Sequence, residues 1–289
     1  MAKADMFENR IFKINDDRYI SYFEVGEGEN VLFLIHGWLS SKESWIPMIQ
    51  FLDNKEFRVI AVDLLGHGGS SRSLRLKFDT SENVSILAKF AMSLGVRNIV
   101  IVGHSLGGKI SLFLANRLAG FSKTLVKKVI IVNSIGSYEF WRSLPTLMKV
   151  MLYKPIRSLI GFFTIPFFIK FYFKELLFLF PLSEEIKENI SKYLSEYTSS
   201  HFESFRNKRC ALRITKNLFD VFVEDIERSE LPEVDIVWTA EDKVVPLQVQ
   251  YKFSQLFKKP VYILSGAGHM SPVEIPDKLA KTVSLLCKT

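Results

Sequence analysis

The chain has 289 residues, of which 48% are hydrophobic and 24% charged, and its formal net charge is +7. These proportions are typical of a folded globular enzyme and exclude an extended disordered protein. The basic balance suits an acidic partner or an anionic membrane surface. It is accompanied by no zinc-finger, RNA-recognition or basic-helix motif, so we expect no nucleic-acid partner.

The cysteine content and the N-terminus bear on the compartment. Two cysteines, Cys210 and Cys287, are too few for a disulfide framework in a chain of this length. The first residues include acidic side chains where a signal peptide has its apolar core. We therefore expect a cytoplasmic protein in a reducing compartment, with peripheral contact to a membrane as an added option.

The chain opens with two short alternating stretches, Arg10–Ile14 and Tyr19–Val25, which predict an antiparallel pair of strands. Continuous apolar runs follow, and such runs indicate strands buried on both faces of a sheet. They are Val31–Ile35, Arg58–Val62, Asn98–Val102, Val129–Val132, Ile236–Trp238 and Val261–Leu264. Helical patterns cover Ser81–Leu94, Leu106–Ala119 and Pro276–Leu286. This alternation predicts an α/β fold with a mostly parallel central sheet flanked by helices.

The alternation stops between residues 137 and 230, where helical patterns follow one another without a buried strand. We predict an inserted helical cap at 137–230, over a core made of 1–136 and 231–289. The first half of the cap is rich in phenylalanine and the second half is amphipathic and charged. The uncharged run Ser158–Ile169 covers 12 residues, short of the ~20 that a membrane-spanning helix needs. We expect no membrane span.

The most informative segment is Gly103-His104-Ser105-Leu106-Gly107, in which an apolar strand runs into G-x-S-x-G and a helical pattern begins at once. A serine projected from such a tight turn needs small residues two positions before and after it, and both positions are glycine. We expect strained backbone geometry at Ser105, worth on the order of 1–3 kcal/mol. The helix N-terminus, with the N–H of Leu106, faces developing negative charge. Ser105 is the predicted nucleophile.

The chain resembles the α/β-hydrolase family, in its serine esterase and lipase branch with a helical cap. The resemblance lies in Gly103-His104-Ser105-Leu106-Gly107-Gly108, His36-Gly37-Trp38, Asp63-Leu64-Leu65-Gly66-His67-Gly68 and Gly268-His269. The family order of nucleophile, acid and base implies Ser105, Asp242 and His269. It also implies that the backbone N–H groups of Trp38 and Leu106 form the oxyanion hole. Serine at position 105 argues against the dehalogenase and epoxide-hydrolase branches, which use aspartate there.

The base and the acid follow from what a serine needs. A serine hydroxyl needs a neighbouring base, and that base needs a carboxylate to fix its tautomer. His269 follows the last strand in a glycine-rich loop that can reach the carboxyl edge of the sheet. Asp242 is favoured over the adjacent Glu241 by its register with Pro246, on resemblance alone. Thr239 departs from the family, because related sequences often have glycine there.

Other polar residues near these motifs receive structural interpretations. His36 and His67 are expected to shape their loops, and Asp63 is expected to cap or bond its own local backbone. In such a turn His104 is expected to point away from the nucleophile. No two histidines have the spacing of a metal site, so we expect no metal and no other cofactor.

The substrate pocket is the least constrained part of the prediction. Its candidate lining residues are Trp38, His104 and Met270 near the serine, with Phe162, Phe163 and Phe167 from the cap. The phenylalanines fit a core for the cap, an acyl-binding tunnel or a lipid boundary, and these interpretations are compatible. We predict a serine carboxylic ester hydrolase that acts on an apolar acyl ester through an acyl-enzyme.

The alternatives are a thioesterase, a carbon–carbon bond hydrolase or a lactonase of the same fold, and a slow-turnover protein that binds a ligand or docks on a membrane. Fold and triad do not determine acyl length, alcohol group or oligomeric state.

Overall fold

The computed structural model describes residues 5–144, 146, 149 and 203–289. Within these residues eight strands form one sheet, in the order β1-β2-β4-β3-β5-β6-β7-β8. The strands are β1 (Arg10–Asn15), β2 (Arg18–Val25), β3 (Asn30–Ile35), β4 (Phe57–Val62), β5 (Ile99–His104), β6 (Val126–Val132), β7 (Glu233–Thr239) and β8 (Val261–Leu264). β2 pairs antiparallel with β1 and β4, and the remaining pairs are parallel. The predicted antiparallel opening and mostly parallel sheet are confirmed.

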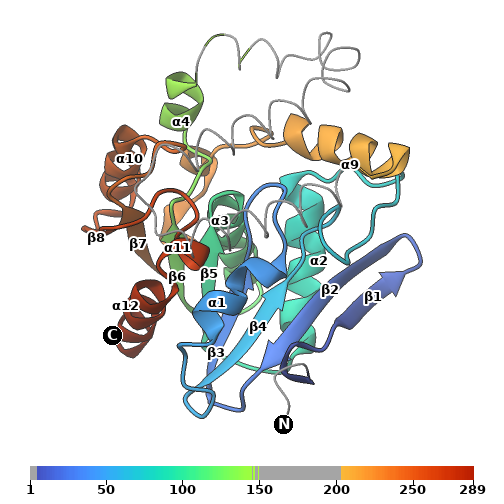
Figure 1. Cartoon of the computed structure of the whole chain (residues 1–289), viewed down its shortest axis with the longest axis horizontal. Coiled ribbons are helices and arrows are strands. Elements are labelled where there is room, and N and C mark those ends of the chain that lie inside the picture. Colours follow the sequence, from blue (N-terminus) through green and yellow to red (C-terminus); the bar gives the residue numbers. More distant parts are fainter. Residues whose placement is uncertain (1–4, 145, 147–148, 150–202) are drawn as a thin grey trace.

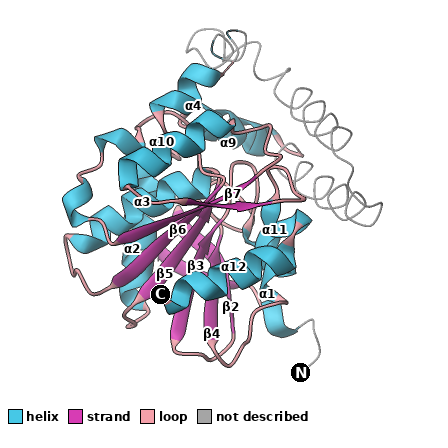
Figure 2. Ribbon diagram, turned by 90° about the vertical axis from the view of Figure 1, so that its left-hand side faces the viewer, coloured by secondary structure: helices cyan, strands magenta, loops and turns pink. Residues whose placement is uncertain are grey.

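Helices cover both faces of this sheet (Figures 1 and 2). The α-helices are α1 (Ile46–Ile49), α2 (Thr80–Ser93), α3 (Leu106–Ala119), α4 (Tyr138–Ser143), α9 (Phe205–Lys216), α10 (Leu247–Phe257), α11 (Ser271–Glu274) and α12 (Pro276–Lys288). Short 3₁₀ helices occupy η1 (Asp5–Phe7), η2 (Lys42–Trp45), η3 (Val223–Asp225) and η4 (Arg228–Glu230). The three predicted helices correspond to α2, α3 and α12.

The apolar strand runs supply both faces of the sheet because successive side chains of a strand point to opposite sides. In β3, Phe33 and Ile35 join the core under α2, α3 and α10, whereas Leu32 and Leu34 join the core under α1 and α12. All four side chains are fully buried. Two-sided burial of the central strands is therefore confirmed.

The last strand departs from this pattern. β8 pairs only with β7, at the edge of the described sheet. Its Tyr262 is 38% exposed and its Ile263 is 50% exposed. The prediction of two-sided burial is wrong for β8, because a strand with one neighbour is covered on fewer sides than its sequence suggests.

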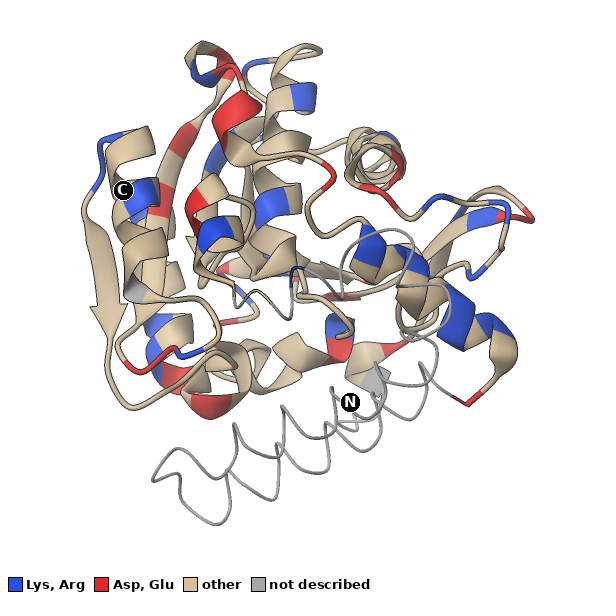
Figure 3. Ribbon diagram, turned by 90° about the horizontal axis from the view of Figure 1, so that it is seen from above, with Lys and Arg blue, Asp and Glu red and all other residues tan. Residues whose placement is uncertain are grey.

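The described parts of the predicted insertion, α4 and α9, lie at one end of the molecule (Figure 1). Helix α9 is amphipathic: it buries Cys210, Ala211 and Ile214, and basic residues are spread along it (Figure 3). After α9 the chain is fixed to the core by the buried Lys109, whose Nζ lies 2.7 Å from Asp220 Oδ1 and 3.0 Å from the carbonyl oxygen of Leu218.

Part of the sequence prediction falls on residues that the structure does not describe. These are Phe162, Phe163, Phe167 and the Ser158–Ile169 run, and most of the 137–230 insertion with them. Within the described ranges, no helix combines the length and the apolar character needed to cross a membrane.

Candidate active site

The turn between β5 and α3 holds Ser105 in an unusual backbone conformation, with φ 54° and ψ −115°. Positive φ is uncommon for a residue other than glycine and costs free energy. The flanking glycines are sterically required. A Cβ on Gly103 would lie 2.3 Å from the carbonyl oxygen of Gly107, and a Cβ on Gly107 would lie 2.1 Å from that of Ile35. The strained turn and the two small positions predicted around Ser105 are both present.

Three loops at the carboxyl ends of parallel strands bring Ser105, His269 and Asp242 together. The Oγ of Ser105 lies 3.0 Å from Nε2 of His269. Nδ1 of the same ring lies 2.9 Å from Oδ2 of Asp242. A carboxylate at Nδ1 accepts the ring hydrogen there and leaves Nε2 free to accept the serine proton. The geometry is that of a nucleophile, a base and an orienting acid.

The Asp242 carboxylate is 1% exposed and is held on both oxygens. Oδ1 accepts the N–H groups of Val244 and Val245 at 2.8 and 2.9 Å. Oδ2 accepts from Nδ2 of Asn133 at 2.7 Å as well as from His269. Burial alone would raise the pKa of Asp242, but His269 and the N–H donors outweigh it and hold this pKa below its ordinary value. The group is therefore an anion in the neutral pH range.

Glu241, the rival carboxylate, has a different partner set. Its two oxygens accept the N–H groups of Gly266 and Ala267, at distances between 3.1 and 3.3 Å. These bonds tie the loop after β7 to the loop after β8. The structure thus places Asp242 against the ring of His269. Glu241 instead contacts the backbone of the residues that precede His269 in the loop.

The loop that carries His269 is fixed by buried side chains. The carboxylate of Glu274, on α11, accepts the N–H of Gly268 at 2.5 Å and the N–H of Met270 at 3.0 Å. It is 4% exposed, and burial raises its pKa. Our sequence analysis missed Glu274. The one signal was an acidic residue in the first turn of a short helix beside a glycine-rich loop.

His104 lies beneath the base rather than in a pocket. Its Nε2–H donates to the carbonyl oxygen of His269 at 2.7 Å, and its ring lies edge-on to Trp45. Burial, together with the nearby His269, lowers the pKa of His104 to about 3, so the ring is neutral. The prediction that His104 lines the substrate pocket is wrong, because the residue is 3% exposed and its ring is bonded to the base loop.

The loop after β3 passes directly beside the serine. A Cβ on Gly37 would lie 3.2 Å from Cβ of Ser105. Nδ1–H of His36 donates to the Gly37 carbonyl oxygen at 2.7 Å, while Nε2 accepts the N–H of Leu64 at 3.1 Å. Because a trans peptide is planar, its N–H points away from its C=O. Holding the Gly37 carbonyl therefore also sets the direction of the Trp38 N–H.

A second imidazole holds the same loop one residue further on. Nε2 of His67 accepts the N–H of Leu39 at 3.2 Å, and its Nδ1–H donates to the carbonyl oxygen of Leu65 at 3.1 Å. Leu39 has φ 49°, a conformation that needs such support. The rings of His36 and His67 lie 5.0 Å apart, edge to face. The loop-shaping role expected of both histidines agrees with these contacts.

Oδ2 of Asp63 accepts the N–H of Gly69 in its own loop at 2.9 Å, as expected, and Asp63 also forms a buried ion pair that our sequence analysis missed. Its Oδ1 accepts the N–H of Lys42 at 2.8 Å, and its Oδ2 lies 2.7 Å from Lys42 Nζ. Asp63 is fully buried and Lys42 is 1% exposed. The pair joins the loop after β3 to the loop after β4.

The remaining pocket candidates are near the serine loops. The indole N–H of Trp38 donates to Oγ1 of Thr215 at 3.2 Å, so Trp38 bridges the core and α9. Trp38 also packs against the buried cluster of Leu39 and Ala211. Met270 is 7% exposed at the start of α11. As the first residue of α3, Leu106 has an N–H without a partner inside the helix.

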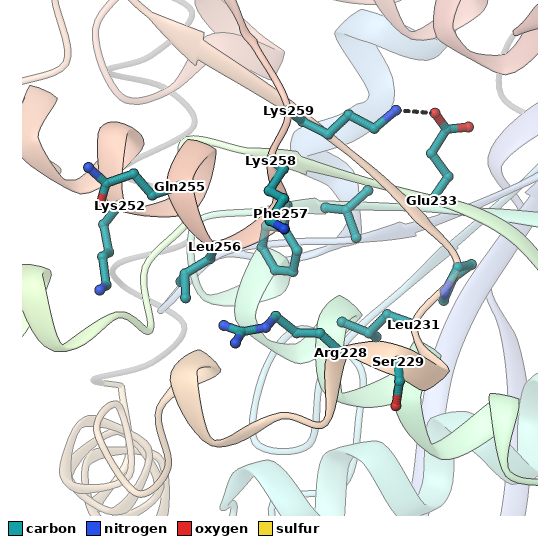
Figure 4. Close-up of a pocket in the computed structure, with 12 residues that line it drawn as sticks. Arg228, Ser229, Leu231, Glu233, Lys252, Gln255, Leu256, Phe257, Lys258 and Lys259 are labelled. Carbon is teal, nitrogen blue, oxygen red and sulfur yellow. Dashed lines mark hydrogen bonds and ion pairs between the residues drawn. The ribbon is translucent and has the colours of Figure 1, made fainter.

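A separate cavity of about 580 Å³ lies at the opposite end of the sheet, where β7 begins and α10 ends. Its lining includes Arg228, Lys252 and Phe257, and the ion pair between Lys259 and Glu233 borders it (Figure 4). Ser105 lies at the carboxyl ends of the strands, so this cavity is not part of the site described above.

The sequence and the fold are matched by known proteins. The family model for the alpha/beta hydrolase fold matches residues 30–276. The uncharacterized hydrolase YugF of Bacillus subtilis (strain 168) is 26% identical over 270 residues, covering 89% of each chain. The 2-hydroxy-6-oxo-6-(2'-aminophenyl)hexa-2,4-dienoic acid hydrolase of Metapseudomonas resinovorans is 27% identical over 278 residues, covering 92% of this chain and 87% of the relative.

Solved structures share the architecture at lower identity. The esterase EaEST from Exiguobacterium antarcticum has a TM-score of 0.75 and 15% identity, covering 98% of this chain and all of that one. At this identity the likeness is one of fold. The family match extends over most of the chain, and the chain belongs to the alpha/beta hydrolase family. This membership supports a hydrolase.

Proposed function

We propose that the chain is a serine carboxylic ester hydrolase that acts on apolar acyl esters through an acyl-enzyme. The observation that carries this proposal is the continuous line of hydrogen bonds from Ser105 Oγ through His269 to Asp242, at 3.0 and 2.9 Å. The strained turn between β5 and α3 presents Ser105 at the start of a helix. That arrangement suits a nucleophile that attacks a carbonyl.

The chemistry follows from the positions of the protons. Nε2 of His269 takes the proton of Ser105 as Oγ attacks the carbonyl carbon of the ester. The negative charge that develops on the carbonyl oxygen is stabilised by the N–H groups of Trp38 and Leu106. His269 then gives its proton to the departing alcohol. Water, deprotonated by the same nitrogen, cleaves the acyl-enzyme and restores the serine.

The anionic Asp242 supports both transfers without accepting a proton itself. It holds the ring of His269 in the tautomer with hydrogen on Nδ1, and it stabilises the imidazolium that forms during attack. Four hydrogen bonds to its oxygens keep it charged in spite of burial. The carboxylate of Asp242 is therefore charged and held in place before the substrate binds.

Apolar surroundings support the choice of an apolar acyl group. Trp38 and Met270 lie on the two loops that flank Ser105, and the phenylalanines expected from the cap would extend this surface. Each methylene that enters such a surface contributes about 0.8 kcal/mol, which is about fourfold in rate constant.

A panel of p-nitrophenyl esters from acetyl to dodecanoyl tests the proposal. We expect kcat/KM to rise by up to about fourfold per methylene over the short members, and Ser105→Ala to abolish turnover throughout. A steep preference for acetyl would contradict an apolar acyl site. Matched acyl thioesters in the same panel distinguish an esterase from a thioesterase.

A carbon–carbon bond hydrolase is the second candidate, favoured by one relative. The Metapseudomonas resinovorans protein is named for hydrolysis of a 6-oxo dienoic acid, a substrate without an ester. Such a substrate also requires recognition of a carboxylate. A 2-hydroxy-6-oxo-dienoic acid in the panel decides between the candidates, and we expect its kcat/KM to lie below that of the best ester.

A further inference from the structure

Thr239, the residue that departs from the family pattern, ends β7 and is 1% exposed. Its Oγ1 lies 2.7 Å from Nδ2 of Asn133 and 2.5 Å from the carbonyl oxygen of Gly268. An amide nitrogen only donates, and a carbonyl oxygen only accepts. The hydroxyl of Thr239 therefore accepts from Asn133 and gives its single hydrogen to Gly268.

Asn133 follows β6, is fully buried and has φ 46°. Asparagine is among the few residues that adopt this left-handed conformation readily. One amide hydrogen goes to Thr239 and the other to Oδ2 of Asp242, both at 2.7 Å. The amide oxygen accepts from Oγ of Ser271 at 3.2 Å. Every polar atom of this side chain is used, so its orientation is fixed.

These bonds form one chain of buried groups, from the Asp242 carboxylate through Asn133 and Thr239 to the Gly268 carbonyl. Gly268 immediately precedes His269. This series of hydrogen bonds therefore connects the acid to the backbone of the base by a second route. The first route is the direct contact between the carboxylate and the imidazole. The series spans the ends of β6 and β7 and the loop after β8.

We propose that Thr239 and Asn133 are positioning residues that set the His269 ring against both Asp242 and Ser105. The proposal rests on the proposed serine-hydrolase function. The base lies in a loop with glycines at 266 and 268, which has little stiffness of its own. Glu274 fixes the N–H of Gly268, and Thr239 fixes its C=O, so both sides of this residue are held.

The loss of the hydroxyl has two local consequences. The Gly268 carbonyl and one amide hydrogen of Asn133 lose their partner in a buried place, which is unfavourable for both groups. Each relaxes toward another partner, and the loop and the amide shift with it. A displacement of about 1 Å at a catalytic group costs up to about a hundredfold in rate.

Thr239→Val tests the proposal, since it removes the hydroxyl and keeps the shape. Thr239→Ser keeps the hydroxyl and serves as the rescue variant. Thr282→Val is the matched control, because Thr282 Oγ1 also donates to a carbonyl oxygen, that of Lys278 on α12, at 2.9 Å. The readouts are kcat and KM on the best ester, the rate of labelling by a fluorophosphonate, and the melting temperature.

We expect Thr239→Val to lower both kcat and the labelling rate by about 10- to 100-fold, with KM within about threefold of the wild-type value. Thr239→Ser is expected to retain at least about a third of both rates, and Thr282→Val to match the wild type. A loss confined to stability would move the melting temperature and leave the labelling rate of the folded protein unchanged.

Two results would overturn the positioning role. One is a wild-type labelling rate in folded Thr239→Val. The other is an equal loss in Thr239→Val and Thr239→Ser, which would assign the effect to packing. Failure of the wild-type chain to react with the fluorophosphonate would instead overturn the proposed function, so the two failures are distinguishable.

A double-mutant cycle tests the linkage between the two residues. Asn133→Gly removes the amide and keeps a residue that accepts positive φ. If the chain of bonds acts as a unit, the double variant loses less activity than the product of the two single losses. Fully multiplicative losses in folded variants would contradict it.

Discussion

Two loops flank Ser105, one after β3 and one after β8, and buried side chains fix both of them by different chemistry. The oxyanion loop at 36–39 is held by the neutral imidazoles of His36 and His67. The base loop at 266–270 is held chiefly by the carboxylate of Glu274 and the hydroxyl of Thr239. In both loops the backbone is held by side-chain hydrogen bonds, from residues that are close in the chain as well as from distant ones.

The difference lies in how each anchor responds to protons. His36 donates from one nitrogen and accepts at the other, a pattern that only a neutral imidazole offers. Burial lowers its pKa to about 4 and so preserves this pattern. In the base loop, the Thr239 hydroxyl donates to the Gly268 carbonyl oxygen, and the Glu274 carboxylate accepts the N–H groups of Gly268 and Met270. Because burial raises the pKa of Glu274, acid also weakens the base loop, through protonation of that carboxylate.

The largest expected effect comes from the residue on which both loops converge. Ser105→Ala should lower kcat by on the order of 10⁶, whichever loop is left intact. The change is expected to leave the melting temperature of the protein near its wild-type value. Ser105→Gly should also be inactive but more stable than Ser105→Ala by about 1–3 kcal/mol, because glycine accepts the φ of 54° without strain. Equal stability of the two variants in urea unfolding would contradict backbone strain at this turn.

On the side of the base loop, Asp242→Asn should lower kcat by on the order of 10⁴ through the wrong histidine tautomer. Glu241→Gln is its neighbour control. Because Glu241 bonds the backbone of Gly266 and Ala267, we expect its loss to change kcat by less than about tenfold. Steady-state kinetics on one ester compare the two variants, and a greater loss in Glu241→Gln would reverse the assignment of the acid.

On the side of the oxyanion loop, His36→Leu removes the donor to the Gly37 carbonyl. We expect kcat to fall by up to about 10²–10³, the cost of losing one oxyanion donor, with a smaller change in KM. His36→Asn can restore a donor close to the position of Nδ1 and should recover part of the loss. If the two variants were equally active, the Gly37 carbonyl would not control the Trp38 N–H.

The smallest expected effect is on the pH dependence of stability. A histidine whose folded pKa is lowered contributes stability that is complete above pH 6.5 and is lost as the pH falls toward the folded value. For His36 this window runs from pH 6.5 to about 4. Urea unfolding between pH 6 and 5 should therefore show a slope lower by about 1.4 kcal/mol per pH unit in His36→Leu than in the wild type. An unchanged slope would show that His36 titrates alike in both states.

The parts of this arrangement that sequence alone could predict are local in the chain. The strand, the two glycines and the helix around Ser105 lie within a few residues, so their pattern identifies the turn. The glycine-rich loop and the order along the chain identify His269 in the same way. Central strands are recognisable because burial on both faces imposes apolar side chains at every position.

The parts that could not be predicted depend on partners far apart in the chain. Asp242 and Glu241 are adjacent, and only the fold determines which carboxylate points at His269. Asn133 meets Asp242 across 109 positions, and Thr239 meets Gly268 across 29. The exposure of β8 depends on its place at the sheet edge, which an apolar run does not reveal.

The most direct test of the account is the intact mass of the protein after reaction with a fluorophosphonate. We predict one adduct per wild-type chain, located at Ser105 by peptide mapping, no adduct in Ser105→Ala and strongly slowed labelling in His269→Ala. Labelling that persists in Ser105→Ala, or a wild-type chain that remains unlabelled, would contradict the assignment of Ser105 as the activated nucleophile.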